Sequence, residues 1–165
     1  MQKRILSLLV DNTAGVLSRI SGLFSRRGYN IDSLSVGVTA DARYSRMTVV
    51  CSGDELILEQ ITKQLAKLVD VRDIKVLEPE NSVSRELVLV KVAAKPEQRE
   101  AIISIANIFR ANVIDVAKES LVIELTGSKS KLGAFVKLLE DYDILELART
   151  GITGLSRGAA DVTFL

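Results

Sequence analysis

The apolar residues of this chain follow the order strand, helix, strand, strand, helix, strand, and the whole order then repeats once. In the first half, short apolar runs and alternating patterns that are typical of strands cover residues 5–10, 31–38, 44–51 and 71–77. Apolar residues at helical spacing cover residues 16–24 and 56–68. This is the order of the ferredoxin-like fold, so it predicts an α+β domain with βαββαβ topology.

The same order begins again after a polar stretch, residues 78–82, whose Pro79 cannot continue a central strand. Strand patterns of the second half cover residues 86–93, 112–116, 121–126 and 144–149, and helical patterns cover residues 96–109 and 129–142. We therefore predict two ferredoxin-like domains in tandem. Their expected bounds are 1–78 for the first domain, 79–84 for a linker and 85–165 for the second domain.

The charge and the hydropathy pattern of the chain exclude several classes of partner. Lys and Arg total 22 and Asp and Glu total 21, so the net charge of +1 leaves no global electrostatic footprint for nucleic acid or an anionic membrane. The apolar runs are far shorter than the roughly 18 residues of a membrane span, and the run that ends at Asp11 is too short for a secretory signal. The single cysteine, Cys51, cannot form an intramolecular disulfide. We expect a cytoplasmic protein.

Two Asn residues mark the junctions where a ligand site is expected in the first half. Asn12 and Gly15 precede the first helix, where unpaired N–H groups and the positive end of the helix dipole can hold a carboxylate. Gly15 allows close approach to the backbone, and the side-chain oxygen of Asn30, before the second strand, suits an ammonium group. Backbone and apolar contacts complete the predicted amino-acid site, which consists of Asn12, Gly15, Val16, Asn30, Ile31 and Leu34.

A purely structural role also explains these residues. Asn and Gly are common caps and turn formers, and Gly28 fits a left-handed helix C-terminus just before Asn30. The corresponding loop of the second half, residues 94–100, contains no glycine, so a ligand site is expected only in the first half. We interpret three arginines as a solvated cluster of cations at the end of the first helix, where the helix dipole favours positive charge. They are Arg19, Arg26 and Arg27.

Catalysis and RNA binding lack the residues that they require. The chain contains no histidine, so neither a Ser-His pair, a Cys-His pair nor an imidazole zinc site can form. Cys51 ends an apolar strand pattern and is interpreted as a packing residue. The glycine-rich segment 151–158 lacks the Lys-Ser/Thr pair of a phosphate-binding loop. RNA-recognition modules share the ferredoxin-like order but stack bases on aromatic residues, whereas these strands carry mainly Leu, Val and Ile.

Five segments, in matching order, resemble the small regulatory subunits of acetohydroxyacid synthase (acetolactate synthase), and the first also resembles the amino-acid-binding ACT domain. They are DNTAGVLSRISGLFSRRGYNIDSL (11–34), SRMTVV (45–50), RELVLVKV (85–92), FRANVIDV (109–116) and GLSRG (154–158). The resemblance implies a homodimer whose first domain is of ACT type. It also implies a pocket between the first loop of one protomer and the second strand of its neighbour, which points to the same six site residues.

The resemblance further implies a non-catalytic regulatory subunit. Such a subunit binds the large catalytic subunit, raises its activity and transmits feedback inhibition by a branched-chain amino acid, with valine as the expected effector. Thiamine diphosphate, magnesium and FAD are then expected on the catalytic subunit, and no cofactor on this chain. The alternative is a stand-alone ACT-type sensor that controls another enzyme or a transcription factor, and segments 109–116 and 154–158 argue against it.

Overall fold

The computed structural model describes residues 1–159, which form two compact units. Unit 1 contains Met1–Ser84 and the segment that begins at Ile152, and unit 2 contains Arg85–Gly151. Residues 160–165, which belong to the predicted second domain, lie outside the described residues. The domain bounds 1–78, 79–84 and 85–165 stay a prediction.

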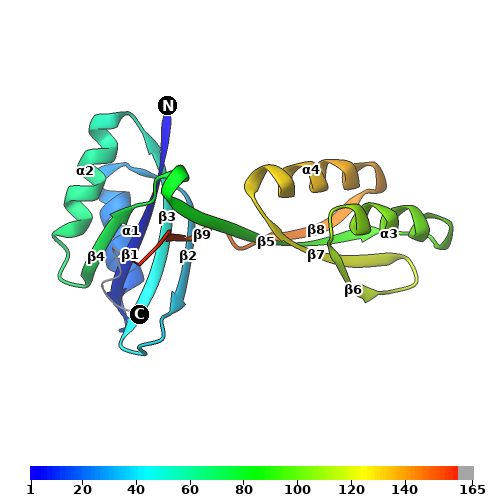
Figure 1. The fold of residues 1–165 in the computed structure, drawn as a ribbon, viewed down its shortest axis with the longest axis horizontal. Helices are drawn as coiled ribbons and strands as arrows, with labels where there is room; N and C mark the ends of the chain where they lie inside the picture. The colour runs from blue at the N-terminus through cyan, green and yellow to red at the C-terminus, as the bar shows by residue number, and fades with distance from the viewer. Residues whose placement is uncertain (160–165) are drawn as a thin grey trace. The chain divides into compact units, whose positions relative to one another are not determined.

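Unit 1 is an antiparallel sheet with both of its helices on one face (Figure 1). Its elements in chain order are β1 (Gln2–Asp11), α1 (Val16–Arg27), β2 (Asn30–Val38), β3 (Tyr44–Gly53), α2 (Glu55–Ala66) and β4 (Val71–Val76). The strands lie in the order β2-β3-β1-β4, and each neighbouring pair is antiparallel. The predicted ferredoxin-like order of the first half is confirmed.

The core of unit 1 lies between the sheet and the two helices. Alternate residues of the central strands β1 and β3 face the helices, because side chains of a strand point to its two faces in turn. Core members from the strands and helices include Leu6, Leu8, Val10, Met47, Val49, Cys51, Ile20, Phe24, Ile61 and Leu65. The helices bury the middle of the sheet, and none of the side chains of the edge strand β2 is fully buried.

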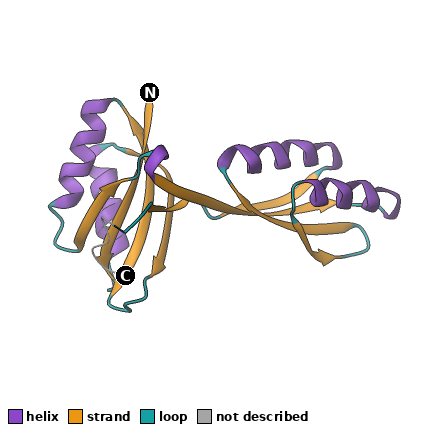
Figure 2. Ribbon diagram, viewed as in Figure 1, coloured by secondary structure: helices purple, strands orange, loops and turns teal. Residues whose placement is uncertain are grey.

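Unit 2 repeats this architecture, with both helices on one face of its sheet (Figure 2). Its elements are β5 (Ser82–Ala93), which begins in unit 1, then α3 (Arg99–Ile108), β6 (Asn112–Val116), β7 (Ser120–Gly127), α4 (Lys129–Leu139) and β8 (Ile144–Arg149). The strand order is β6-β7-β5-β8. The prediction of two ferredoxin-like βαββαβ modules in tandem is therefore confirmed.

Three short 3₁₀ helices modify the predicted element bounds. One of them, η1 (Pro79–Asn81), lies inside the predicted linker. The predicted helix 96–109 is divided into η2 (Pro96–Gln98) and α3, and the predicted helix 129–142 ends as η3 (Glu140–Tyr142). Asp143, which has a positive φ of 61°, follows η3 and turns the chain into β8.

The segment after β8 forms a strand that the sequence analysis did not predict. This strand, β9 (Thr153–Ser156), pairs with β5. The backbone N–H of Gly154 donates to Oγ1 of Thr48 at 3.3 Å, and Oγ of Ser35 donates to the carbonyl of Ile152 at 3.0 Å. Thr48 lies between two core residues of β3 and so points away from the helices. The β9 segment therefore lies on the sheet face that the helices leave uncovered.

Gly154 packs closely against unit 1 because it lacks a Cβ. A Cβ at this position would lie 2.9 Å from Cδ1 of Leu77 and 3.2 Å from the backbone oxygen of Val83. Contacts this short force the neighbours to move. The first glycine of the GLSRG segment therefore serves close packing of β9 on unit 1.

Candidate functional site

The loop between β1 and α1 leaves the N-terminus of α1 without a capping side chain. Gly15 stands at the N-cap with φ 87°, in the left-handed region that favours glycine. Among the described residues, no side chain caps α1, and its first turn holds no acid. Asp54, in contrast, caps α2 by accepting a 2.8 Å hydrogen bond from the N–H of Ile57. The first N–H groups of α1, from Val16 onward, are therefore suited to an anionic ligand.

Asn12 ties this loop to the hairpin between β2 and β3. Its backbone N–H donates to the carbonyl of Arg43 at 2.8 Å, and its Nδ2 donates to the carbonyl of Ala42 at 3.0 Å. The side-chain oxygen of Asn12 takes part in neither bond. The Nδ2 group of Asn12 thus holds the loop, whereas the side-chain oxygen of Asn12 is the acceptor suited to a ligand.

Arg19, one turn into α1, reaches back to Gly15. Its Nε donates to Oδ2 of Asp70 at 2.5 Å, and its Nη2 donates to Oδ1 at 3.0 Å. A Cβ built on Gly15 would lie 2.8 Å from Nη1 of Arg19. The hydrogen bond from Arg19 holds the pKa of the Asp70 carboxyl below its usual range. The cation of this ion pair faces solvent and the anion does not, because the Arg19 side chain is 50% exposed and that of Asp70 is 9% exposed.

The structure corrects the sequence interpretation of the three arginines of α1. Arg26 and Arg27 lie in the last turn, where the helix dipole favours cations, as expected. Arg19 does not belong to that cluster, because it lies in the N-terminal half of the helix and pairs with Asp70. The sequence spacing could have indicated this position of Arg19. Residues four apart lie above one another on a helix, so residue 19 lies over residue 15.

The other half of the predicted site lies at the start of β2. Nδ2 of Asn30 donates to Oδ1 of Asp32 at 2.6 Å and to Oγ of Ser52 at 3.4 Å. With its nitrogen engaged, the amide presents its oxygen as the group for an N–H donor such as an ammonium. Ile31 and Leu34 are partly buried and pack against the core of unit 1.

The two halves of the predicted site lie at opposite ends of the sheet within one chain. Asn30 pairs with Ser52, which in turn lies beside Lys3 near the start of β1. Gly15 follows the other end of β1, at Asp11. At about 3.3 Å per residue, the eight steps along β1 separate these ends by about 26 Å. One protomer therefore does not bring Asn12, Gly15 and Val16 together with Asn30, Ile31 and Leu34.

The edge strand β2 carries exposed apolar side chains. It pairs only with β3 among the described strands. Val36 and Val38 lie near its C-terminal end and are 49% and 63% exposed. The outer edge of such a strand presents unpaired backbone groups that can pair with another strand. β2 therefore has the properties of an edge that another chain can cover.

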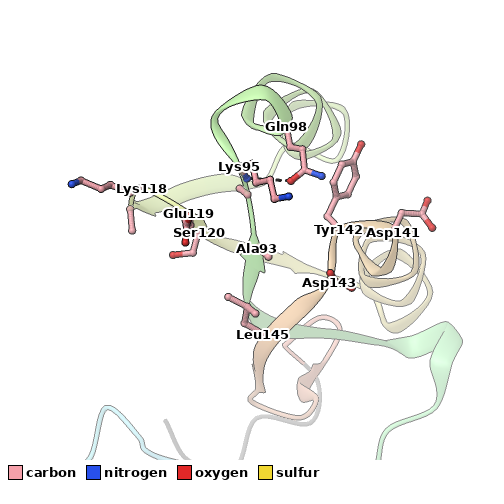
Figure 3. Close-up of a pocket in the computed structure, with 12 residues that line it drawn as sticks. Ala93, Lys95, Gln98, Lys118, Glu119, Ser120, Asp141, Tyr142, Asp143 and Leu145 are labelled. Atoms are coloured by element: carbon pink, nitrogen blue, oxygen red, sulfur yellow. Dashed lines mark hydrogen bonds between the residues drawn. The ribbon is translucent and has the colours of Figure 1, made fainter.

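Unit 2 has an open hollow at the place that corresponds to the β1–α1 loop of unit 1. It has a volume of about 760 Å³ and lies where β5 ends, beside the β6–β7 hairpin and the turn before β8. The N–H of Lys95 donates to Oε1 of Gln98 at 3.1 Å, near Tyr142, whereas the side chains of Lys118 and Asp141 extend to opposite sides (Figure 3). Lys118 and Asp141 therefore do not converge on one point of the hollow.

The described part of the chain lacks the groups for metal chemistry and for membrane insertion by a helix. Within residues 1–159, no group of three or more His, Cys, Asp or Glu side chains could hold a metal ion. No helix in that range is long and apolar enough to cross a membrane. Burial raises the pKa of the Cys51 thiol to about 11, so the thiol is protonated at neutral pH and is a weak nucleophile.

Comparison with known proteins gives consistent matches over most of the chain. Residues 6–73 match the family model of the AHAS small subunit-like ACT domain. Residues 85–158 match the family model of the small subunit of acetolactate synthase. A probable acetolactate synthase small subunit from Archaeoglobus fulgidus is 50% identical, over 94% of this chain and 98% of that protein. The isozyme 3 small subunit from Salmonella typhimurium is 49% identical, over 94% and 96% of the two chains.

A solved structure shows the same likeness in three dimensions. The crystal structure of an acetolactate synthase small subunit from Thermotoga maritima matches with a TM-score of 0.90 and 40% sequence identity. The match covers 97% of this chain and 100% of that chain. Both modules of the present chain are thus similar to one known architecture.

Proposed function

We infer, from the fact that this chain belongs to the family of acetolactate synthase small subunits, that it is a non-catalytic regulatory subunit. It binds the large catalytic subunit, raises the activity of that subunit and transmits feedback inhibition by a branched-chain amino acid, with valine as the effector. The condensation of 2-oxo acids, with thiamine diphosphate, magnesium and FAD, belongs to the catalytic subunit. Both subunits work in the cytoplasm.

Family membership carries the regulatory role, and the proposed effector site is shared by two protomers because its predicted residues lie at the two ends of one sheet. Val38, at the end of β2, pairs with Ser45, which lies beside Val10 and hence near the β1–α1 loop. If β2 pairs with its copy in antiparallel fashion, Asn30 of one protomer lies next to the Val38 end of the other. The two halves of the site then meet across the dimer interface.

In this dimer each effector molecule contacts both protomers. The N–H groups of Gly15 and Val16 receive the carboxylate, beside the side chain of Asn12. From the partner protomer, the oxygen of Asn30 accepts the ammonium and the backbone of Ile31 adds a polar contact. The branched side chain is the remaining part of the ligand, and it packs against the apolar side chain of Leu34.

The same dimer links ligand binding to regulation. A ligand that touches both protomers stabilises one arrangement of the β2 edges over others, and this arrangement sets the fit to the catalytic subunit. A coupling free energy of about 1–3 kcal/mol is typical of such linkage and changes affinity by about 5–150-fold. Pairing of β2 also covers the exposed side chains of Val36 and Val38.

Calorimetric titration of the purified chain with valine is the direct test. Leucine, isoleucine and the straight-chain norvaline serve as comparison ligands, and reconstitution with a catalytic subunit follows. We expect saturable valine binding, a rise in synthase activity on adding the chain, and loss of that activity when valine is added. Absence of valine binding to the free chain, together with valine-insensitive activity of the reconstituted complex, would contradict the proposed sensor.

A further inference from the structure

We propose that Arg19 is a further binding residue of this site and that it selects ligands with a free carboxylate. The inference rests on the proposed function, because it concerns the effector that Gly15 and Val16 receive. The guanidinium of Arg19, oriented by Asp70, donates a hydrogen bond from Nη1 to one carboxylate oxygen. Asp70 is the positioning residue, since it acts only through Arg19.

The geometry of the ion pair places the third nitrogen of Arg19 at the loop. Nε and Nη2 make the two hydrogen bonds to Asp70, and Nη1 makes neither of them. Nη1 is also the atom nearest to the position that a Cβ on Gly15 would occupy, at 2.8 Å. A bidentate pair fixes the plane of the guanidinium, so the direction of the Nη1 hydrogens is fixed as well.

The charges at this end of the sheet favour an anion at Nη1. Arg19 lies close to the positive end of the α1 dipole, where a cation is disfavoured unless an anion lies beside it. Asp70 supplies one anion from the protein side, but it is almost completely buried, so solvent meets the guanidinium. The neighbouring Asp11 is itself bound by Arg72, with Nε to Oδ1 at 2.7 Å.

This arrangement of Arg19 predicts that the site prefers a carboxylate over a primary amide. A carboxylate accepts both from the backbone N–H groups at the helix start and from Nη1, in a charge-assisted hydrogen bond. A primary amide has no negative charge, and its NH₂ end would face donors. Valine should therefore bind more tightly than valinamide, and Arg19 should account for a measurable part of that ratio.

The test neutralises the ion pair as a unit, because removing Arg19 alone would leave the buried Asp70 without its partner. The double variant Arg19→Gln/Asp70→Asn keeps a neutral hydrogen-bonding pair of similar size. The matched control is Arg72→Gln/Asp11→Asn, which neutralises a second bidentate pair at the same end of the sheet. Circular dichroism and thermal unfolding check that both variants fold.

The readout is the ratio of the dissociation constants for valinamide and valine, measured by calorimetry on the wild-type dimer and on both variants. We expect the first double variant to bind valine about tenfold more weakly or worse, because it loses a charge-assisted hydrogen bond. The ratio of the two dissociation constants should fall by the same factor. Valinamide affinity and the control variant should change by less than twofold.

Two contrary outcomes separate this inference from the proposed function. Wild-type protein that binds no valine overturns the proposed function, and this inference with it. Wild-type protein that binds valine, with an unchanged ratio in the first double variant, overturns only the role of Arg19. If that variant does not fold, Arg19→Lys replaces it, because an ammonium point charge cannot hold Asp70 and the ligand in one plane. An unchanged ratio in Arg19→Lys likewise overturns the inference.

Discussion

Asn12 and Asn30 lie at opposite ends of the unit 1 sheet, although both belong to one predicted ligand site. Asn12 contacts the β2–β3 hairpin through Ala42, whereas Asn30 contacts Asp32 and Ser52 near the start of β1. A site that needs both residues requires two protomers.

Gly15→Asp should abolish the response to valine. The new carboxylate would lie beside Nη1 of Arg19 and occupy the place of the ligand carboxylate, and φ 87° strains any side chain at this position. We expect the valine concentration for half-maximal inhibition to rise at least tenfold in the reconstituted synthase. Gly133→Asp, which adds the same side chain to an open part of α4, should leave inhibition unchanged. Equal valine sensitivity of both variants would refute the assignment of Gly15.

Asn30→His should also make the complex less sensitive to valine. The substitution removes the amide that Asp32 orients and fills the start of β2 with a ring. We expect at least a tenfold loss of valine affinity by calorimetry, with the fold retained. Asn112→His is the matched control, because Asn112 is the first residue of β6, the corresponding strand of unit 2. The prediction is wrong if the two variants bind valine equally well.

Val36→Lys should weaken the dimer. Val36 is half exposed on the edge strand β2, and lysine on an edge opposes pairing with a second strand through charge repulsion. We expect light scattering to show a shift from dimer to monomer at micromolar concentration, with valine affinity lost in parallel. Val69→Lys changes an exposed valine in the turn before β4 and should leave the mass unchanged. A dimer that survives Val36→Lys would place the interface elsewhere.

Gly154→Ala should destabilise unit 1. The added Cβ would lie 2.9 Å from Cδ1 of Leu77 and 3.2 Å from the backbone oxygen of Val83, so the Leu77 side chain must move and the backbone at Val83 must shift slightly. Overpacking of this kind costs about 1–3 kcal/mol in the free energy of unfolding. Urea unfolding measures the change. Gly133→Ala has open space around it inside α4 and should stabilise by about 1 kcal/mol, the helix-propensity difference. Equal midpoints for the two variants would count against close packing of β9.

Cys51 should lower the stability of the chain at alkaline pH. Burial raises the pKa of its thiol to about 11, above the ordinary value of 9.0, because the folded state disfavours the thiolate. The contribution of the neutral thiol is therefore fully present below pH 9 and declines as pH rises from 9 through about 11. Cys51→Val removes this group, so the stability difference between wild type and variant should change between pH 8 and pH 10.5. A constant difference would mean that the thiol titrates normally.

Local patterns were sufficient to predict the architecture of both modules. The alternation of β1 and β3 and the stripes of α1 and α2 reflect which face of each element is buried, and burial is a property that neighbouring residues encode together. The same logic located Gly15 at a helix start and Asn30 at a strand start. It also assigned Arg19 to the wrong cluster, because a basic residue on a helix gives no local sign of its partner.

What the sequence by itself determined is therefore the element order, the buried faces and the residues at each turn. Only the tertiary structure decided that Arg19 meets Asp70, 51 residues away, that β9 lies on the uncovered face of unit 1, and that Asn12 and Asn30 lie far apart in one chain. The reason is physical: periodicity repeats over two to four residues and reports burial, whereas distances between remote residues depend on strand order and register, which no short-range pattern contains.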